Sequence, residues 1–165
     1  LEAPDLPFGL GSGAGTIYGT TGGVAEAVVR HCMPDKSRNT LRALEYSPLR
    51  GNESIREATI PVGDREIKLA VVHGLINAQK LLKEIDEGTA YYDLIEVMTC
   101  PNGCVGGAGQ PYGLKAKKQA RSAGLYATDR SAPFKRAEYN PGVTSILQKL
   151  THEQRHELLH VNYQK

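Results

Sequence analysis

The sequence lacks long hydrophobic runs and any strong excess of charge of one sign. No apolar stretch approaches the roughly 20 residues that a membrane-spanning helix requires, so we expect no membrane span. The 20 basic and 18 acidic residues are spread along the chain and leave a net charge of +2, which provides no electrostatic footprint for nucleic acid or a membrane surface. At 165 residues, 40% of them hydrophobic, the chain is long enough for a single domain with a core.

Cysteine is scarce, and its three positions are Cys32, Cys100 and Cys104. An odd number argues against a disulfide framework and leaves metal binding or reactive thiols as the alternatives. Without a disulfide framework, we expect a reducing, cytoplasmic setting. The first residues also have neither the basic nor the apolar region of a signal peptide. The chain also begins without Met and enters a glycine-rich stretch at once, which predicts a cut inside a longer protein.

The order of predicted elements indicates an α/β fold. Residues 9–23 contain seven glycines and are predicted to form a loop, followed by a helix from Val24 to Cys32 with Cys32 facing the core. Residues 60–62 and 66–72 are predicted strands around the turn Gly63-Asp64. A helix over 75–85 and a second apolar strand over 93–98 complete a strand, helix, strand unit, which implies parallel pairing.

The remaining third of the chain is predicted to be polar and helical. We expect helices over 114–121 and 142–150, and an amphipathic tail over 151–163. The basic run at 115–121 is interpreted as a solvated helix face. The fold class predicted from these patterns is a small, mainly parallel β-sheet flanked by helices.

The chemistry-bearing segment follows the second apolar strand, where ligands gather in parallel sheets. Three residues separate Cys100 from Cys104, and a glycine-rich run follows them. Thiolates are ligands for iron–sulfur clusters and soft metals, although this spacing alone is a weak signal and slightly favours a disulfide or two ordinary thiols. An iron–sulfur cubane needs about four thiolates, so at least one further ligand must lie elsewhere.

A longer pattern around these cysteines resembles a known family. The residues Glu96-x-Met98-x-Cys100-x-x-Gly103-Cys104-x-x-Gly107-Ala108-Gly109-Gln110-Pro111 resemble the third cluster-binding signature of the iron-only ([FeFe]) hydrogenases. Residues 13–27 are similar to the family's glycine-rich wall of the active site, and residues 156–160 with Tyr163 to its C-terminal tail. The chain departs from the family pattern at Ala108, where a glycine is usual, and at Tyr18, where a Phe is usual.

The resemblance implies roles for individual residues. Cys100 would ligate a [4Fe–4S] cubane, and Cys104 would bridge that cubane to a two-iron subsite, the two together forming the H-cluster. Met98 and Tyr18 would line the two-iron pocket and are the catalytic candidates. The remaining cofactor-binding candidates are Gly19, Gly107 and Gln110.

The resemblance also implies an incomplete enzyme. The family's other two cluster signatures occur nowhere in the sequence. Residues 1–165 would therefore be a single domain, the C-terminal lobe of a two-lobed catalytic domain whose N-terminal lobe is missing. The parent oxidoreductase would catalyse 2H⁺ + 2e⁻ ⇌ H₂ with ferredoxin or NADH-linked subunits as electron partners. This fragment alone would bind no two-iron subsite and be inactive.

Parts of the sequence also resemble motifs of three other functions. Non-catalytic iron–sulfur assembly proteins, including nuclear lamin-recognition factors, share much of residues 100–110. The motif His156-Glu157-x-x-His160 matches a zinc protease pattern, with His152 one further turn away, but three histidines in one line along a helix span about 12 Å and cannot converge on one ion. A dinucleotide fingerprint starting at Gly13 fails because Tyr18 replaces its last glycine.

Overall fold

The computed structural model describes residues 8–9, 11–34, 38–45, 47–51 and 53–161. Its three strands are β1 (Ile55–Val62), β2 (Arg65–His73) and β3 (Leu94–Met98). Its α-helices are α1 (Gly13–Ile17), α2 (Gly23–Cys32), α3 (Arg38–Glu45), α4 (Leu75–Asp86), α5 (Lys115–Ser131), α6 (Pro141–Leu147) and α7 (His152–Leu159), with short 3₁₀ turns at Cys104–Gly106 and Ala137–Tyr139. None of the helices described is long and apolar enough to cross a membrane.

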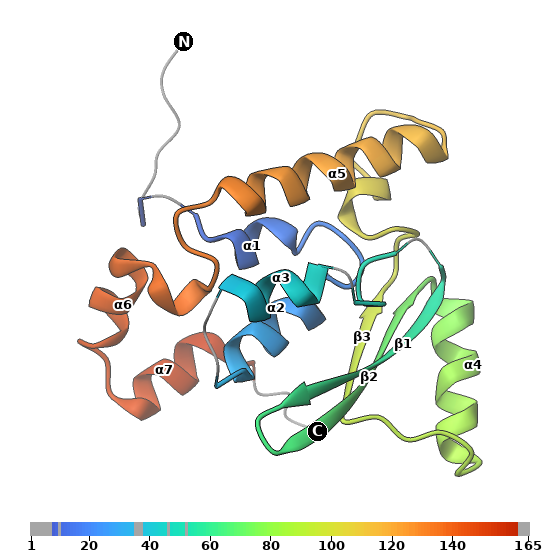
Figure 1. The fold of residues 1–165 in the computed structure, drawn as a ribbon, viewed down its shortest axis with the longest axis horizontal. Helices are drawn as coiled ribbons and strands as arrows, with labels where there is room; N and C mark the ends of the chain where they lie inside the picture. The colour runs from blue at the N-terminus through green and yellow to red at the C-terminus, as the bar shows by residue number, and fades with distance from the viewer. Residues whose placement is uncertain (1–7, 10, 35–37, 46, 52, 162–165) are drawn as a thin grey trace.

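The sheet has the order β1-β2-β3 and is mixed (Figure 1). Strands β2 and β3 pair in parallel, from Leu69 opposite Leu94 to His73 opposite Met98, so the predicted strand, helix, strand unit is confirmed. The expectation of a mainly parallel sheet is wrong, because β1 pairs antiparallel to β2. Only Gly63 and Asp64 separate these two strands, and so short a connection can join only antiparallel neighbours.

Both faces of the sheet are covered. On one face, Leu69 and Val71 of β2 pack with Val29 of α2 and Leu44 of α3. On the other face, the intervening β2 residues Ala70 and Val72 pack with Ala78 and Leu81 of α4. Burial on both faces explains why β2 is continuously apolar rather than alternating.

The glycine-rich segment contains a helix where a loop was predicted. Ser12 caps α1, its hydroxyl accepting a hydrogen bond from the Gly15 N–H at 3.1 Å. A Cβ atom on Gly13 would lie 2.0 Å from a carboxylate oxygen of Asp129, so this glycine allows close packing against α5 rather than a turn. The number of glycines therefore gave the wrong local structure here.

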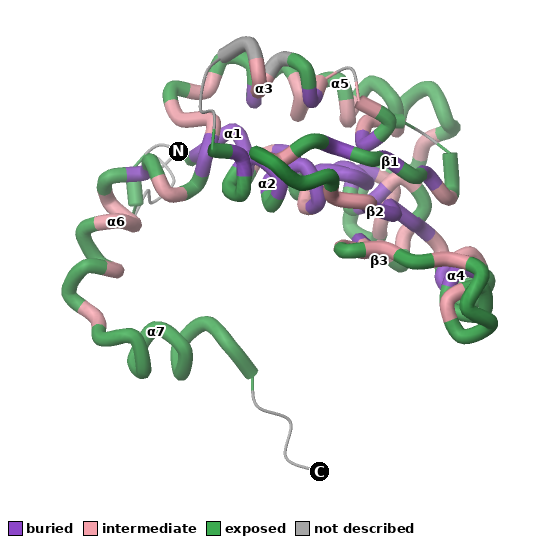
Figure 2. Tube along the Cα trace, turned by 60° about the horizontal axis from the view of Figure 1, so that its bottom comes forward, coloured by how far each residue is buried: buried purple, intermediate pink, exposed green. Residues whose placement is uncertain are grey.

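Three further expectations are corrected by the structure. Cys32 is exposed, because it is the last residue of α2 and the next residue, Met33, takes the core position in extended conformation. Helix α5 continues well past Arg121. Helix α7 does not pack through an amphipathic face, because each of its residues is exposed and the helix projects from the body of the protein (Figure 2).

Candidate metal centre

The two neighbouring cysteines lie on a tight loop that begins directly after β3. Cys100 is partly buried, Cys104 is exposed, and both are free thiols. The Gly103 N–H donates to the Cys100 carbonyl at 3.0 Å, and the Gly107 N–H donates to the Cys104 carbonyl, also at 3.0 Å. The loop turns sharply because Asn102 and Gly103 both have positive φ angles, 68° and 84°.

This loop is fixed to the glycine-rich segment that precedes α2. The Thr21 N–H donates to the Asn102 carbonyl at 3.2 Å, and the Val105 N–H donates to the Gly19 carbonyl at 3.1 Å. A Cβ on Gly103 would lie 2.8 Å from the Thr21 nitrogen, so the two backbones approach as closely as glycine allows. Two segments that are distant in sequence thus form one unit around the cysteines.

Glycine also lies against the first thiol. A Cβ on Gly107 would be 3.2 Å from the Cys100 sulfur, so the peptide backbone directly adjoins that sulfur. Ala108 and Gln110 are exposed on the outer part of the same loop. The departure from the family's glycine pattern therefore falls at an exposed residue.

Met98 lies at the same sheet edge as the cysteines. Side chains alternate along a strand, so Met98 points to the same face as Glu96, whose carboxylate contacts the start of α2. Tyr18, 48% exposed, directly precedes Gly19 on the other segment. The structure thus brings Gly19, Cys104 and Gly107 together with Cys100, and leaves Gln110 farther out on the loop.

Cys100 and Cys104 could supply two of the four thiolates that an iron–sulfur cubane needs. Within the part of the chain that the structure describes, no group of three or more His, Cys, Asp or Glu side chains could hold a metal ion. Cys32 is no third ligand, because α2 begins beside the cysteine loop and its 10 residues place Cys32 about 15 Å away at the far end. Two cysteine thiolates on one glycine-rich loop suit a cluster whose other ligands come from outside these residues.

Two buried charged residues next to the loop, Glu96 and Arg56, were given no role from the sequence, although Glu96 begins the pattern around the cysteines. Glu96 accepts hydrogen bonds from the backbone N–H groups of Gly22 at 2.6 Å and Ala25 at 2.7 Å. Arg56 donates to the carbonyl oxygens of Thr21, Leu49, Glu53 and Pro48 at 2.7–3.2 Å, and burial lowers its pKa. A Glu within the apolar strand 94–98 was a usable signal, because a buried carboxylate must find partners.

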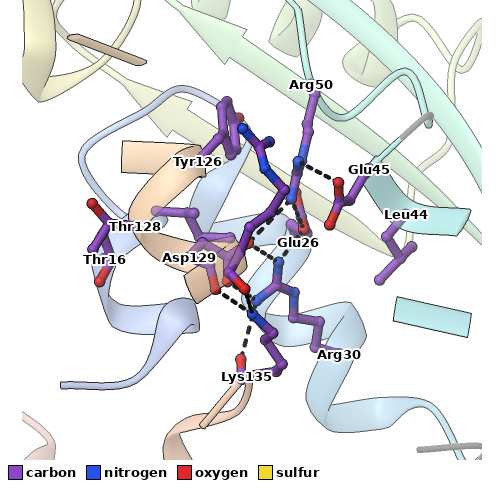
Figure 3. Close-up of polar contacts among 12 residues, drawn as sticks. Thr16, Glu26, Arg30, Leu44, Glu45, Arg50, Tyr126, Thr128, Asp129 and Lys135 are labelled. Carbon is purple, nitrogen blue, oxygen red and sulfur yellow. Dashed lines mark hydrogen bonds and ion pairs between the residues drawn. The ribbon is translucent and has the colours of Figure 1, made fainter. Parts of the chain in front are cut away.

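A second buried polar cluster joins α2 to α5 (Figure 3). Arg30 contacts Glu26 at 2.6 Å and Asp129 at 2.7 Å, and Arg50 contacts the same two carboxylates at 2.8 and 3.3 Å. The Arg50 guanidinium also lies 4.1 Å from the centre of the Tyr126 ring. Burial alone would lower the pKa of Arg30, but the hydrogen bonds and charges of Asp129 and Glu26 outweigh it and raise that pKa. This cluster holds the fold together and offers no open ligand site.

The histidines of the C-terminal helix do not form a metal centre in the structure. His152 and His156, with Glu153 and Glu157, line an open pocket of about 330 Å³. The rings of His156 and His160 stack at 4.5 Å. Because no third ligand joins any pair, the zinc protease pattern has no structural support among the residues described.

Comparison with known proteins decides the family. Residues 1–108 match the family model described as iron only hydrogenase large subunit, C-terminal domain. The chain belongs to the iron-only hydrogenase family. Residues 115–165 match a second model, iron hydrogenase small subunit. The buried cluster around Arg30 and Asp129 therefore joins the two parts that these hydrogenase models describe.

Individual relatives agree with this assignment. The chain is 38% identical to the NADP-reducing hydrogenase subunit HndD of Solidesulfovibrio fructosivorans, covering 98% of this chain and 28% of the relative. It is 33% identical to the cytosolic iron–sulfur assembly component 3 of Mus musculus, covering 88% of this chain and 31% of the relative. A solved structure of the [FeFe]-hydrogenase from Chlamydomonas reinhardtii superposes with a TM-score of 0.69 at 33% identity, covering 98% of this chain and 50% of that one. The chain thus spans about a third or less of these curated relatives and half of the solved hydrogenase.

Proposed function

We propose that the chain is the C-terminal lobe of an iron-only hydrogenase catalytic domain and that Cys100 and Cys104 are cluster ligands. The observation that carries this proposal is the loop itself, which bears two free thiols, places the Cys100 sulfur against the Gly107 backbone, and is fixed by backbone hydrogen bonds to the Gly19–Thr21 segment. A bound H-cluster would supply the redox chemistry of 2H⁺ + 2e⁻ ⇌ H₂. The protein residues would hold, orient and shield it.

Each nearby residue has a specific task in this proposal. The two thiolates bind iron, and the glycines at 19 and 107 let the backbone approach the cluster closely. Met98 and Tyr18 would line the pocket of the two-iron subsite and limit the access of water to it. Gln110 contributes at the rim of the loop. The other thiolates, about two for a cubane, belong to an N-terminal lobe that is the principal partner, so that this chain alone is inactive.

We also propose a cellular location and electron partners for the whole protein. We place it in the cytoplasm with ferredoxin or NADH-linked subunits as electron partners, in keeping with its free cysteines. A second candidate is a non-catalytic iron–sulfur assembly protein, which the similarity to the mouse assembly component supports. The higher identity to HndD over nearly the whole chain favours the hydrogenase.

A chimera distinguishes the two candidates. The chain would replace the matching C-terminal part of iron hydrogenase 1 of Clostridium pasteurianum, with which it shares 33% identity over 172 residues. We expect hydrogen evolution from the chimera and none from its Cys104→Ser form, with Cys32→Ser as the active control. A folded, iron-loaded chimera without hydrogen evolution would support the assembly protein instead.

A further inference from the structure

A single peptide group beside the cysteine loop is held between two buried charges. The Gly22 N–H donates to one carboxylate oxygen of Glu96 at 2.6 Å. The carbonyl oxygen of the same peptide group, that of Thr21, accepts from the guanidinium of Arg56 at 3.1 Å. Arg56 and Glu96 are only 6% and 7% exposed. An anion and a cation thus bind the two ends of one peptide dipole.

Each charge is fixed by further contacts of its own. The second Glu96 oxygen accepts from the Ala25 N–H at 2.7 Å, so the carboxylate lies at the N-terminus of α2, where the helix dipole favours negative charge. The Arg56 guanidinium also donates to the carbonyls of Leu49, Glu53 and Pro48. Hydrogen bonds with one ionised partner are roughly twice as strong as neutral ones, so this peptide group is held more firmly than an ordinary loop peptide.

The Thr21–Gly22 peptide belongs to the same segment, residues 19–22, to which the cysteine loop is hydrogen-bonded. The Thr21 N–H donates to Asn102, and the Gly19 carbonyl accepts from Val105. Gly22 has a φ of +91°, and a Cβ there would lie 1.9 Å from the Leu49 carbonyl oxygen, so the segment cannot shift toward that side. Motion of the Thr21–Gly22 peptide would therefore be transmitted to the backbone on both sides of Cys104.

We infer that Glu96 and Arg56 are positioning residues that hold the Cys100–Cys104 loop in the geometry that receives the iron–sulfur cluster. This inference rests on the proposed function. The hydrogen bonds of both side chains go to other groups than the thiols. Their effect passes through the Thr21–Gly22 peptide and the hydrogen bonds to Asn102 and Val105.

The first test measures amide hydrogen exchange in the 165-residue chain, which requires no iron. Glu96→Gln leaves one acceptor oxygen for two N–H donors, and Arg56→Met removes all the carbonyl contacts. We expect both changes to speed exchange at Thr21 and Val105 at least tenfold, with Ala58 and Leu69 in the β1–β2 pairing unaffected. Arg56→Lys, which keeps the charge but makes fewer hydrogen bonds, should have an intermediate effect.

The second test measures the midpoint potential of a reconstituted iron–sulfur cluster. The chain is reconstituted anaerobically with iron and sulfide in the presence of dithiothreitol, whose thiolates substitute for the absent ligands. We expect Glu96→Gln and Arg56→Met each to shift the midpoint potential by at least about 59 mV. For a one-electron couple, this shift is a tenfold change in the ratio of oxidised to reduced cluster at a given potential. Arg30→Met is the matched control, because it also removes a buried charge, but one that lies on α2 and away from the cysteine loop. It should lower the melting temperature without shifting the potential.

The outcomes separate the inference from the function on which it rests. If Cys100→Ser and Cys104→Ser take up as much iron as the unmodified chain, the proposed function fails. The exchange rates still decide whether Glu96 and Arg56 hold the Thr21–Gly22 peptide in place. Exchange at Thr21 and Val105 that stays within twofold of the unmodified chain, or speeds equally in the β1–β2 pairing, overturns the inference. So does a cluster potential that matches the unmodified chain in both variants.

Discussion

The guanidinium of Arg30 and the carboxylate of Asp129 lie 2.7 Å apart, with only 2% and 1% of their side chains exposed. Asp129→Ala would leave Arg30 buried with only part of its compensating charge. Removing one partner of a buried ion pair typically costs about 3–5 kcal/mol, and we expect a loss of that size in the free energy of unfolding, measured by urea denaturation. Lys83→Ala, which breaks the exposed pair with Glu87, should change nothing measurable. Equal effects of the two changes would contradict this account of the core.

The same pair predicts how stability depends on pH. Burial alone would raise the pKa of Asp129, but the hydrogen bonds and charge of Arg30 lower it below its ordinary value. A carboxyl whose pKa is depressed in the folded state contributes stability above its unfolded pKa, about 4, and loses that contribution as the pH falls through the lower folded value. Urea midpoints measured below about pH 4 should therefore fall less steeply in Asp129→Asn than in the unmodified chain. An identical acid dependence would show that Asp129 is not the responsible group.

Two glycines that follow Cys100 allow the stability cost of backbone strain to be measured separately from the cost of close packing. Gly103 and Gly109 have nearly equal positive φ angles, +84° and +85°, but only Gly103 lies against another segment. Gly109→Ala should cost about 1–2 kcal/mol from backbone strain alone. Gly103→Ala should cost about 1–3 kcal/mol more, because its methyl group would meet the Thr21 backbone, and it should also expose Cys100 to alkylating reagents. Thermal unfolding and thiol labelling of both variants check the difference.

The C-terminal helix should contribute little to the stability of this chain. Leu158 and Leu159 are 69% and 68% exposed. Changing both to Ser should leave the free energy of unfolding within about 0.5 kcal/mol of the unmodified value. Leu81→Ala, at a buried position under the sheet, should cost about 2–5 kcal/mol in the same measurement. A large loss from the exposed pair would mean that α7 packs on the chain in solution.

The sequence predicted the parts of the fold that depend on local periodicity. The unit formed by β2, α4 and β3 could be predicted because its apolar residues follow strand and helix spacing and Gly74 and Gly88 lie at the ends of the helix. The mixed sheet could have been recognised from the short turn at Gly63. Helix α1 could not, because its first glycine, Gly13, is required by contact with Asp129, a residue distant in sequence.

The residues predicted for the candidate site came from the pattern 96–111 and from the glycine-rich segment that contains Tyr18 and Gly19. The pattern 96–111 indicated the loop but gave no sign that Thr21 and Gly19 hold it in place. Arg56 carried no local signal, because its partners are backbone carbonyls from separate segments. Such contacts depend on how the chain folds back on itself, which spacing along the sequence does not encode.

The central claim is that the thiols of Cys100 and Cys104 bind iron whose other ligands lie on another polypeptide segment. The most direct measurement is the iron and sulfide content of the anaerobically reconstituted chain, with and without dithiothreitol, for Cys100→Ser, Cys104→Ser and Cys32→Ser. We expect stable iron binding only when small thiols are supplied, strong loss in the first two variants, and no loss in Cys32→Ser. Iron content that is the same in all three variants would contradict the account.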